Sequence, residues 1–104
     1  MKILLVIPCF LLWYSCTKPL PGCPSDNRDD LEFHFLHSPF NAYLDAMFNF
    51  EVSPEENCEA FKTSISNLIK AYEDLIDCTR SENDIRNDEG QIFSFNRQLE
   101  FYNC

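Results

Sequence analysis

Residues 53–80 read SPEENCEAFKTSISNLIKAYEDLIDCTR and form a long periodic segment. Ser53 stands before Pro54, and Glu56 follows three residues after the serine, so the segment opens like a capped helix with proline at its first position. Apolar side chains then recur every three or four residues, with polar ones between them. We predict one amphipathic helix from Ser53 to about Arg80, with an inward face made of Cys58, Phe61, Ile65, Leu68, Ile69, Tyr72, Leu75, Ile76 and Thr79.

An earlier helix is predicted in HSPFNAYLDAMFNF, residues 37–50. Ser38 would cap it and Pro39 would be its first residue, where a missing N–H costs nothing. Its apolar residues recur at helical spacing, and we expect them to face the core: Phe40, Tyr43, Leu44, Met47 and Phe48. Residues 29–37 fit neither the helical nor the strand period cleanly, so either an extra helical turn or two or an extended piece remains open there.

The C-terminal part of the chain predicts a third helix. Residues 80–90 are polar and rich in turn formers, which indicates a loop, and Asn87 or Asp88 would cap the helix that follows. The helical stripe consists of Ile92, Phe95, Leu99 and Tyr102, although QIFSF within it also suits a short strand. The fold class is therefore all-α, a small three-helix bundle.

The first residues, MKILLVIPCFLLWYSCT, have one lysine, an apolar run and then small residues, which is typical of a secretory signal peptide. We assign residues 1–17 to this signal, 18–37 to an irregular segment rich in proline and turn formers, and 38–104 to an extracellular three-helix domain. Cleavage after Thr17 removes two of the six cysteines. From the signal peptide we predict a secreted or cell-surface location.

Four cysteines remain, an even number that indicates a disulfide framework in a small exported domain. Three pairings are formally possible. With short connections, consecutive helices pack antiparallel, which places Cys58 and Cys104 at one pole of the bundle and Cys23 and Cys78 at the other. We therefore predict the bridges Cys58–Cys104 and Cys23–Cys78.

The net charge of the chain and its lack of catalytic motifs exclude several classes of function. The chain has a formal charge of −9, and all its acidic residues follow the signal, so nucleic acid and anionic membrane surfaces are not expected as partners. His34 and His37 complete no metal-binding pattern, and Glu73, Asp74 and Asp77 fit a solvated helix face better than a catalytic group. No phosphate loop, serine–histidine–acid set or Cys-x-x-Cys occurs, so we expect a binding protein without cofactors rather than an enzyme.

The chain has an excess of phenylalanine, ten in all, and two explanations of it remain open. Phe33, Phe35, Phe93 and Phe101 fall outside the clearest stripes, which fits either an exposed aromatic patch or a core that wraps all round a small bundle. If a patch exists, we expect it on the third helix and its approach. The candidate partner-binding residues there are Arg86, Phe93, Arg97, Phe101 and Tyr102.

Several motifs resemble the ectodomain of the receptor activity-modifying proteins, which are accessory subunits of class B peptide-hormone receptors. In that family one helix carries a tyrosine and a leucine and runs into Cys-Thr; the matching residues here are Tyr72, Leu75, Cys78 and Thr79. The family's third helix ends in aromatic residues shortly before a cysteine; the matching residues here are Phe95, Phe101, Tyr102 and Cys104. Phe40 and Met47 resemble the family's first-helix pair. The resemblance covers roughly residues 38–104 and implies a three-helix bundle with the bridge Cys58–Cys104.

The chain also departs from that family. The family's first-helix cysteine is replaced by His37 or a neighbour, and its aromatic-proline-asparagine turn is represented only by IRNDEG, residues 85–90, so peptide-binding residues are not transferred. The resemblance implies a co-receptor that binds the extracellular domain of a class B receptor of the calcitonin-receptor type, and with it the receptor's peptide ligand. Membrane contact would come only through this partner or an anchor after Cys104. The alternative is a secreted helical ligand, cytokine-like or toxin-like, that acts directly on a receptor.

Overall fold

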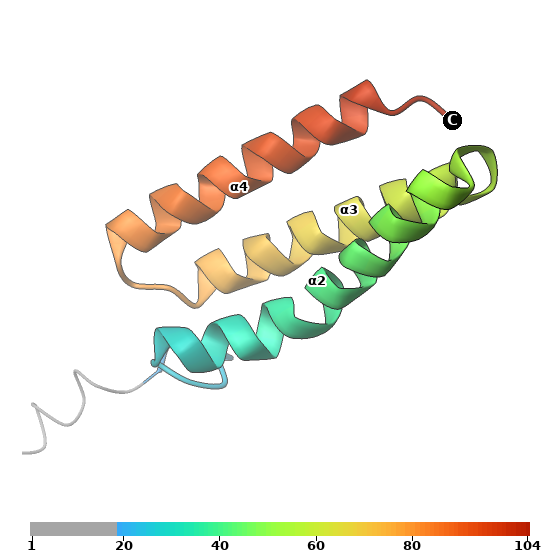
Figure 1. The fold of residues 1–104 in the computed structure, drawn as a ribbon. Coiled ribbons are helices and arrows are strands. Elements are labelled where there is room, and N and C mark those ends of the chain that lie inside the picture. The colour runs from blue at the N-terminus through green and yellow to red at the C-terminus, as the bar shows by residue number, and fades with distance from the viewer. Residues whose placement is uncertain (1–18) are drawn as a thin grey trace, which may run out of the picture.

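A computed structural model describes residues 19–104, and the predicted signal peptide at residues 1–17 lies outside them. The described part contains three helices, α2 from Arg28 to Val52, α3 from Pro54 to Asp77 and α4 from Glu82 to Phe101, and no strand. They run alternately up and down, and α3 lies between its two neighbours (Figure 1). The backbones of α2 and α4 approach α3 but, within residues 19–104, not each other. The predicted all-α, disulfide-linked bundle is confirmed.

Helix α3 follows the prediction most closely. It begins at Pro54, and all the residues predicted to face inward are buried or half-buried. The predicted cap is wrong in one respect, because the Ser53 side chain makes no capping hydrogen bond. Instead the Asn57 side-chain amide donates to the carbonyl oxygens of Asn49 and Ser53, at 3.2 and 3.0 Å, and so ties the end of α2 to the start of α3.

Helix α2 begins at Arg28, so the predictions of an irregular segment up to residue 37 and a cap at Ser38 are wrong. Asn27 is the cap, and its side-chain oxygen accepts a hydrogen bond from the Asp29 backbone N–H at 2.9 Å. Asp29 and Asp30 in the first turn favour this start because carboxylates stabilise the positive end of the helix dipole. Pro39 therefore lies inside α2, which changes direction along its length in Figure 1. Proline removes a backbone N–H and clashes with the preceding turn, which accounts for a bend.

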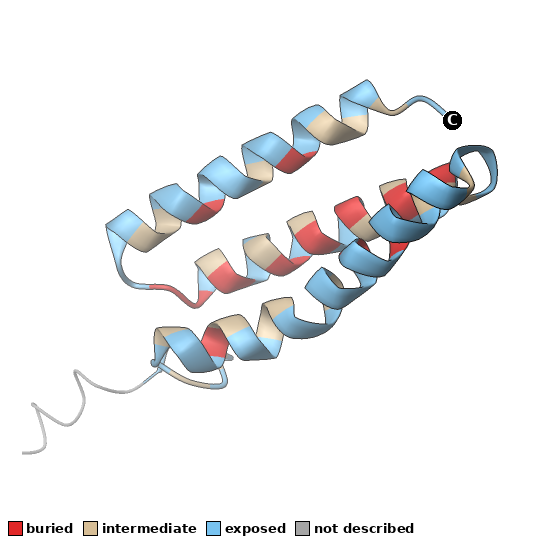
Figure 2. Cartoon of the chain, viewed as in Figure 1, coloured by how far each residue is buried: buried red, intermediate tan, exposed pale blue. Residues whose placement is uncertain are grey.

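The inward face of α2 also differs from the prediction. Of the five residues expected in the core, only Tyr43 is buried, and the other four, Phe40, Leu44, Met47 and Phe48, are exposed. The buried face instead carries Leu31, Tyr43 and Ala46. In Figure 2 the upper half of α2 is consequently almost entirely pale blue, while α3 carries most of the red.

Helix α4 begins at Glu82, so the predictions of a loop over residues 80–90 and of a cap at Asn87 or Asp88 are wrong. Ser81 is the cap, and its hydroxyl accepts from the Asp84 backbone N–H at 3.4 Å. The helical stripe predicted from Ile92 onward is present and continues backward through Asp88 to Ile85. An aspartate at an inward position is the reason that the first turns of this helix looked like a loop.

The core is largely aromatic. Tyr43 of α2 packs on Phe61 of α3 and Phe95 of α4, with ring centroids 5.7 and 5.6 Å apart. Phe61 also contacts Phe50 and Tyr102, at 5.1 and 4.9 Å. These long side chains close the gap between α2 and α4, whose backbones do not touch, and they contribute both buried area and edge-to-face contacts.

Both predicted disulfides are present. Cys23 is bonded to Cys78 and Cys58 to Cys104, with Cα atoms 5.7 and 5.8 Å apart. The Cys23–Cys78 bridge joins the segment before α2 to the end of α3, and the Cys58–Cys104 bridge joins the start of α3 to the chain's last residue. The two bridges therefore fasten opposite ends of α3. Disulfides persist mainly in oxidising compartments, so they are compatible with an extracellular protein.

Candidate protein-interaction surface

The predicted contact residues on α4 fall into two groups. Phe93 is 64% exposed and Phe101 81% exposed, and Arg86 and Arg97 are exposed as well. Phe93, Arg97 and Phe101 succeed one another at four-residue intervals, so they lie along one side of the helix. Tyr102 belongs instead with the core, since its ring packs edge-to-face on Phe50 and Phe61 at 4.9 Å.

Arg97 and Phe93 interact directly. The guanidinium carbon of Arg97 lies 5.9 Å from the centre of the Phe93 ring, which is within the range of a cation–π contact. This contact covers one side of an otherwise exposed ring with a cation. Phe93 therefore offers both an apolar surface and an adjacent positive charge on a chain whose net charge is strongly negative.

Phe93 also borders a hollow between α3 and α4. The hollow has a volume of about 510 Å³, and apolar side chains from both helices form much of its wall, with two glutamates at its edge. Its lining residues are Glu73, Ile76, Ile85, Glu89, Ile92, Phe93 and Asn96. A partly open apolar hollow beside an exposed aromatic ring is a common feature of protein interfaces.

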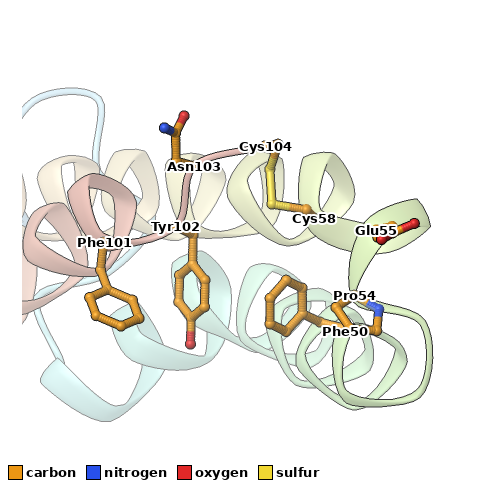
Figure 3. Close-up of a pocket in the computed structure, with 8 residues that line it drawn as sticks. All are labelled: Phe50, Pro54, Glu55, Cys58, Phe101, Tyr102, Asn103 and Cys104. Atoms are coloured by element: carbon orange, nitrogen blue, oxygen red, sulfur yellow. A yellow bond between two sulfur atoms is a disulfide. The ribbon is translucent and has the colours of Figure 1, made fainter.

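A second hollow, of about 410 Å³, lies at the pole that carries the Cys58–Cys104 bridge. Figure 3 shows the rings of Phe50, Tyr102 and Phe101 side by side along it, below the disulfide. The residues come from the end of α2, the start of α3 and the last turn of α4. Because Cys104 holds the final residues against α3, the bridge fixes the position of Phe101 relative to this hollow.

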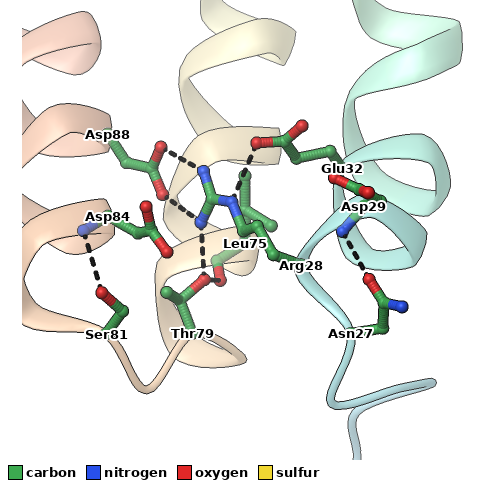
Figure 4. A network of polar contacts seen from close by, with 9 residues as sticks. All are labelled: Asn27, Arg28, Asp29, Glu32, Leu75, Thr79, Ser81, Asp84 and Asp88. Atoms are coloured by element: carbon green, nitrogen blue, oxygen red, sulfur yellow. Dashed lines mark hydrogen bonds and ion pairs between the residues drawn. The ribbon is translucent and has the colours of Figure 1, made fainter.

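At the opposite pole of the bundle, a cluster of hydrogen-bonded polar side chains joins the three helices. This polar cluster was not predicted from the sequence. The Arg28 guanidinium donates from Nη2 and Nη1 to the two carboxylate oxygens of Asp88, at 2.7 and 2.9 Å. Nη1 also donates to Thr79 Oγ1 at 2.8 Å, and Nε donates to Glu32 at 2.9 Å. Thr79 in turn donates to the Leu75 carbonyl oxygen at 2.7 Å. Figure 4 shows how Arg28 reaches from α2 across the end of α3 to α4.

The polar cluster also affects ionisation. The hydrogen bonds to Asp88 above all, opposed by burial and supported by Glu32, raise the pKa of Arg28 above its usual value. Burial is the main reason that the pKa of Tyr72 is raised above 10.0, and the negative charges of Asp88 and Glu32 add to the effect. Both groups therefore lose their protons at a higher pH in the folded chain than they would in the unfolded chain.

The residues considered for other chemistry do not assemble into a site. His34 and His37 are exposed on α2, and no group of metal-binding side chains occurs within residues 19–104. Glu73, Asp74 and Asp77 are exposed on α3, as expected for a solvated face. Within the same stretch, no helix is long and apolar enough to span a bilayer.

Comparisons with known proteins yield no match to this chain among family models, curated proteins or solved structures. The candidate interaction surface is accordingly defined by its own geometry. We define it as the exposed side of α4 with Phe93, Arg97 and Phe101, together with the hollow that α4 shares with α3.

Proposed function

We propose that this chain is an extracellular accessory protein that binds the extracellular domain of a class B peptide-hormone receptor of the calcitonin-receptor type. In this role it changes the receptor's trafficking or its choice of peptide ligand. The observation that carries the proposal is the exposed side of α4, where Phe93 borders an apolar hollow and Phe101 is almost fully solvated. Exposed aromatic side chains beside a hollow are typical anchors of protein–protein contacts.

The resemblance to the receptor activity-modifying proteins supports the choice of partner. Most of the residues that carry it lie in the scaffold: Leu75, Cys78, Thr79 and Phe95 are buried, and Cys104 is disulfide-bonded. Phe40, Met47 and Phe101 also match the family pattern but are exposed, and of these only Phe101 lies on the candidate surface of α4. The resemblance therefore concerns mainly the framework of α3 and α4, and in this proposal Phe101 belongs to the contact.

Co-expression of the tagged full chain with a calcitonin-type receptor tests the proposal. Receptor at the cell surface is measured by flow cytometry, and binding by co-precipitation from non-reducing extracts. We expect the chain to increase surface receptor and to precipitate with it. The Phe93→Ser variant should lose most of the co-precipitation, because an aromatic anchor contributes about 2 kcal/mol or more to a protein interface.

Phe48→Ser is the matched control, since Phe48 is 68% exposed but lies on α2. Equal losses in the Phe93 and Phe48 variants would show that the contact is not on α4. Secretion of the correctly bridged chain alone, without receptor capture or a change in surface receptor, would contradict the accessory role. That outcome would favour the secreted helical ligand instead.

A further inference from the structure

The outer side of α2 carries a row of exposed apolar residues, which we call the outer stripe. Its members are exposed to between 36% and 69%: Phe33, Phe40, Leu44, Met47, Phe48 and Val52. From Phe40 to Val52 they recur at helical spacing, and Phe33 lies two turns before Phe40 on the same side of the helix. The span from the first to the last is about 30 Å at the rise of an α-helix. Single exposed apolar residues are ordinary, but six on one side of a helix indicate a contact site.

The outer stripe leads into a hollow at its N-terminal end. The hollow, of about 430 Å³, lies between α2 and Tyr72 of α3, and its walls include Phe33, Leu36 and Phe40. Asp29 and Glu32 line the same hollow. It therefore offers an apolar recess for one large side chain of a partner, with carboxylates next to it.

The charges of α2 indicate what covers the stripe. The helix carries five carboxylates and a single cation, Arg28, which is already bound to Asp88 and Glu32; the carboxylates are Asp29, Asp30, Glu32, Asp45 and Glu51. Lys2 and Lys18 are the only charged residues before Pro19, so residues 19–104 have six basic and seventeen acidic residues, a net charge of −11. A second copy of the chain would bring two acidic helices together, and anionic lipid would be repelled in the same way.

We propose that the outer stripe of α2 binds a cationic amphipathic helix of a partner protein. An apolar side chain of that helix enters the hollow at Phe33, Phe40 and Tyr72, and further apolar residues cover Leu44, Met47 and Phe48. Lysine or arginine on its flanks pairs with carboxylates of α2. Recognition of this kind combines apolar anchors at helical spacing with complementary charge. This contact lies on a different helix from the surface proposed to bind the receptor and does not depend on that proposal.

The probe is a synthetic helix of about 20 residues, long enough to follow the stripe, with leucine at intervals of three and four and lysine at the remaining polar positions. Binding to the full, oxidised chain is measured by fluorescence anisotropy. One comparison peptide has glutamate in place of lysine, and another has the same composition in an order without helical periodicity. We expect both to bind at least ~10-fold more weakly, because each lacks one of the two kinds of complementarity.

Variants of the chain locate the contact. Leu44→Ser combined with Phe48→Ser should weaken binding of the cationic helix at least ~10-fold, since it removes two central apolar anchors. Asn67→Ser, at an exposed position of α3 outside both proposed surfaces, should leave the affinity unchanged. Equal binding of the aperiodic peptide, or no effect of the α2 double variant, would overturn the proposal. Sedimentation of the chain as a dimer that the double variant dissociates would also overturn it, because a second copy would then occupy the stripe.

Discussion

Arg28 and Asp88 are separated by 60 residues in sequence, yet the two guanidinium nitrogens of Arg28 meet both carboxylate oxygens of Asp88 at 2.7 and 2.9 Å. Asp88 is only 3% exposed, and Arg28 is its ion-pair partner within residues 19–104. The pair joins the first turn of α2 to α4, two helices whose backbones do not otherwise approach each other.

The Asp88→Asn variant should be markedly less stable, because it removes the two-pronged ion pair of the partly buried Arg28 and leaves the guanidinium with only the half-exposed Glu32 as an ionic partner within residues 19–104. Loss of one partner of a buried pair costs about 3–5 kcal/mol, and partial exposure of Arg28 places this case toward the lower value. Urea unfolding followed by circular dichroism gives the free energy of unfolding. The double variant Arg28→Met with Asp88→Leu should recover much of the free energy of unfolding that Asp88→Asn loses, because no buried charge is then left unpaired. A double variant less stable than Asp88→Asn would contradict this account.

The raised pKa of Tyr72 predicts that the free energy of unfolding decreases at alkaline pH. Its folded-state pKa is raised above 10.0, mainly by burial, so the unfolded chain loses this proton at a lower pH than the folded chain does. The contribution of Tyr72 to the free energy of unfolding is complete below the pKa that the tyrosine has in the unfolded chain. It is lost as the pH rises through the pKa that the tyrosine has in the folded chain. Between about pH 9 and 11, the stability of the Tyr72→Phe variant should therefore fall less than that of the parent chain. Parallel curves for the two proteins would show that Tyr72 does not contribute.

Two phenylalanines, Phe61 of α3 and Phe48 of α2, compare the core of the bundle with the outer side of α2. Phe61, 2% exposed, packs on Tyr43, Phe50 and Tyr102, so Phe61→Ala should reduce the free energy of unfolding by about 3–5 kcal/mol. Phe48→Ala should change it by no more than about 0.5 kcal/mol, since that ring lies in solvent. Thermal and urea unfolding of the two variants provide the comparison. A large loss at Phe48 would mean that the outer stripe is part of the core.

The bridge Cys58–Cys104 should stabilise the bundle by about 2–4 kcal/mol, because it restricts the unfolded chain. Replacing both cysteines by alanine should lower the unfolding midpoint by a corresponding amount. It should also release residues 102–104, which hydrogen exchange would detect as faster exchange at the end of α4. Peptide mapping under non-reducing conditions checks the pairing itself, and a Cys58–Cys78 peptide would contradict it.

The sequence predicted α3 well because that helix has a single apolar stripe. For α2 it was misleading, because the helix has two apolar sides, and the side with the larger residues, Phe40, Leu44, Met47 and Phe48, is the exposed one. The buried side includes Ala46 and the interrupting Pro39, which made its period hard to recognise. Contact with α3 decides between the two sides, and periodicity within one helix contains no information about that contact.

The start of α4 and the polar cluster were missed for one shared reason. Asp88 occupies an inward position that hydrophobicity would assign to an apolar residue, and only its partner Arg28, far away in sequence, explains it. Phe93 and Phe101 became contact candidates because they fell outside the clearest apolar stripes of their region, and both are exposed. Tyr102, the third aromatic candidate, packs on Phe50 and Phe61, which come from other helices and so could not be recognised as its neighbours from the sequence.

The two disulfides enclose overlapping loops, with sequence separations of 55 for one pair and 46 for the other. Every peptide bond from Cys23 to Cys104 lies inside at least one loop, because Cys58 precedes Cys78. A single protease cut anywhere in that range, including the turns on either side of α3, therefore leaves both fragments covalently joined. After one cleavage the oxidised domain would remain a single covalent molecule, heavier only by the water consumed in hydrolysis, and would separate into pieces only when a reductant was added.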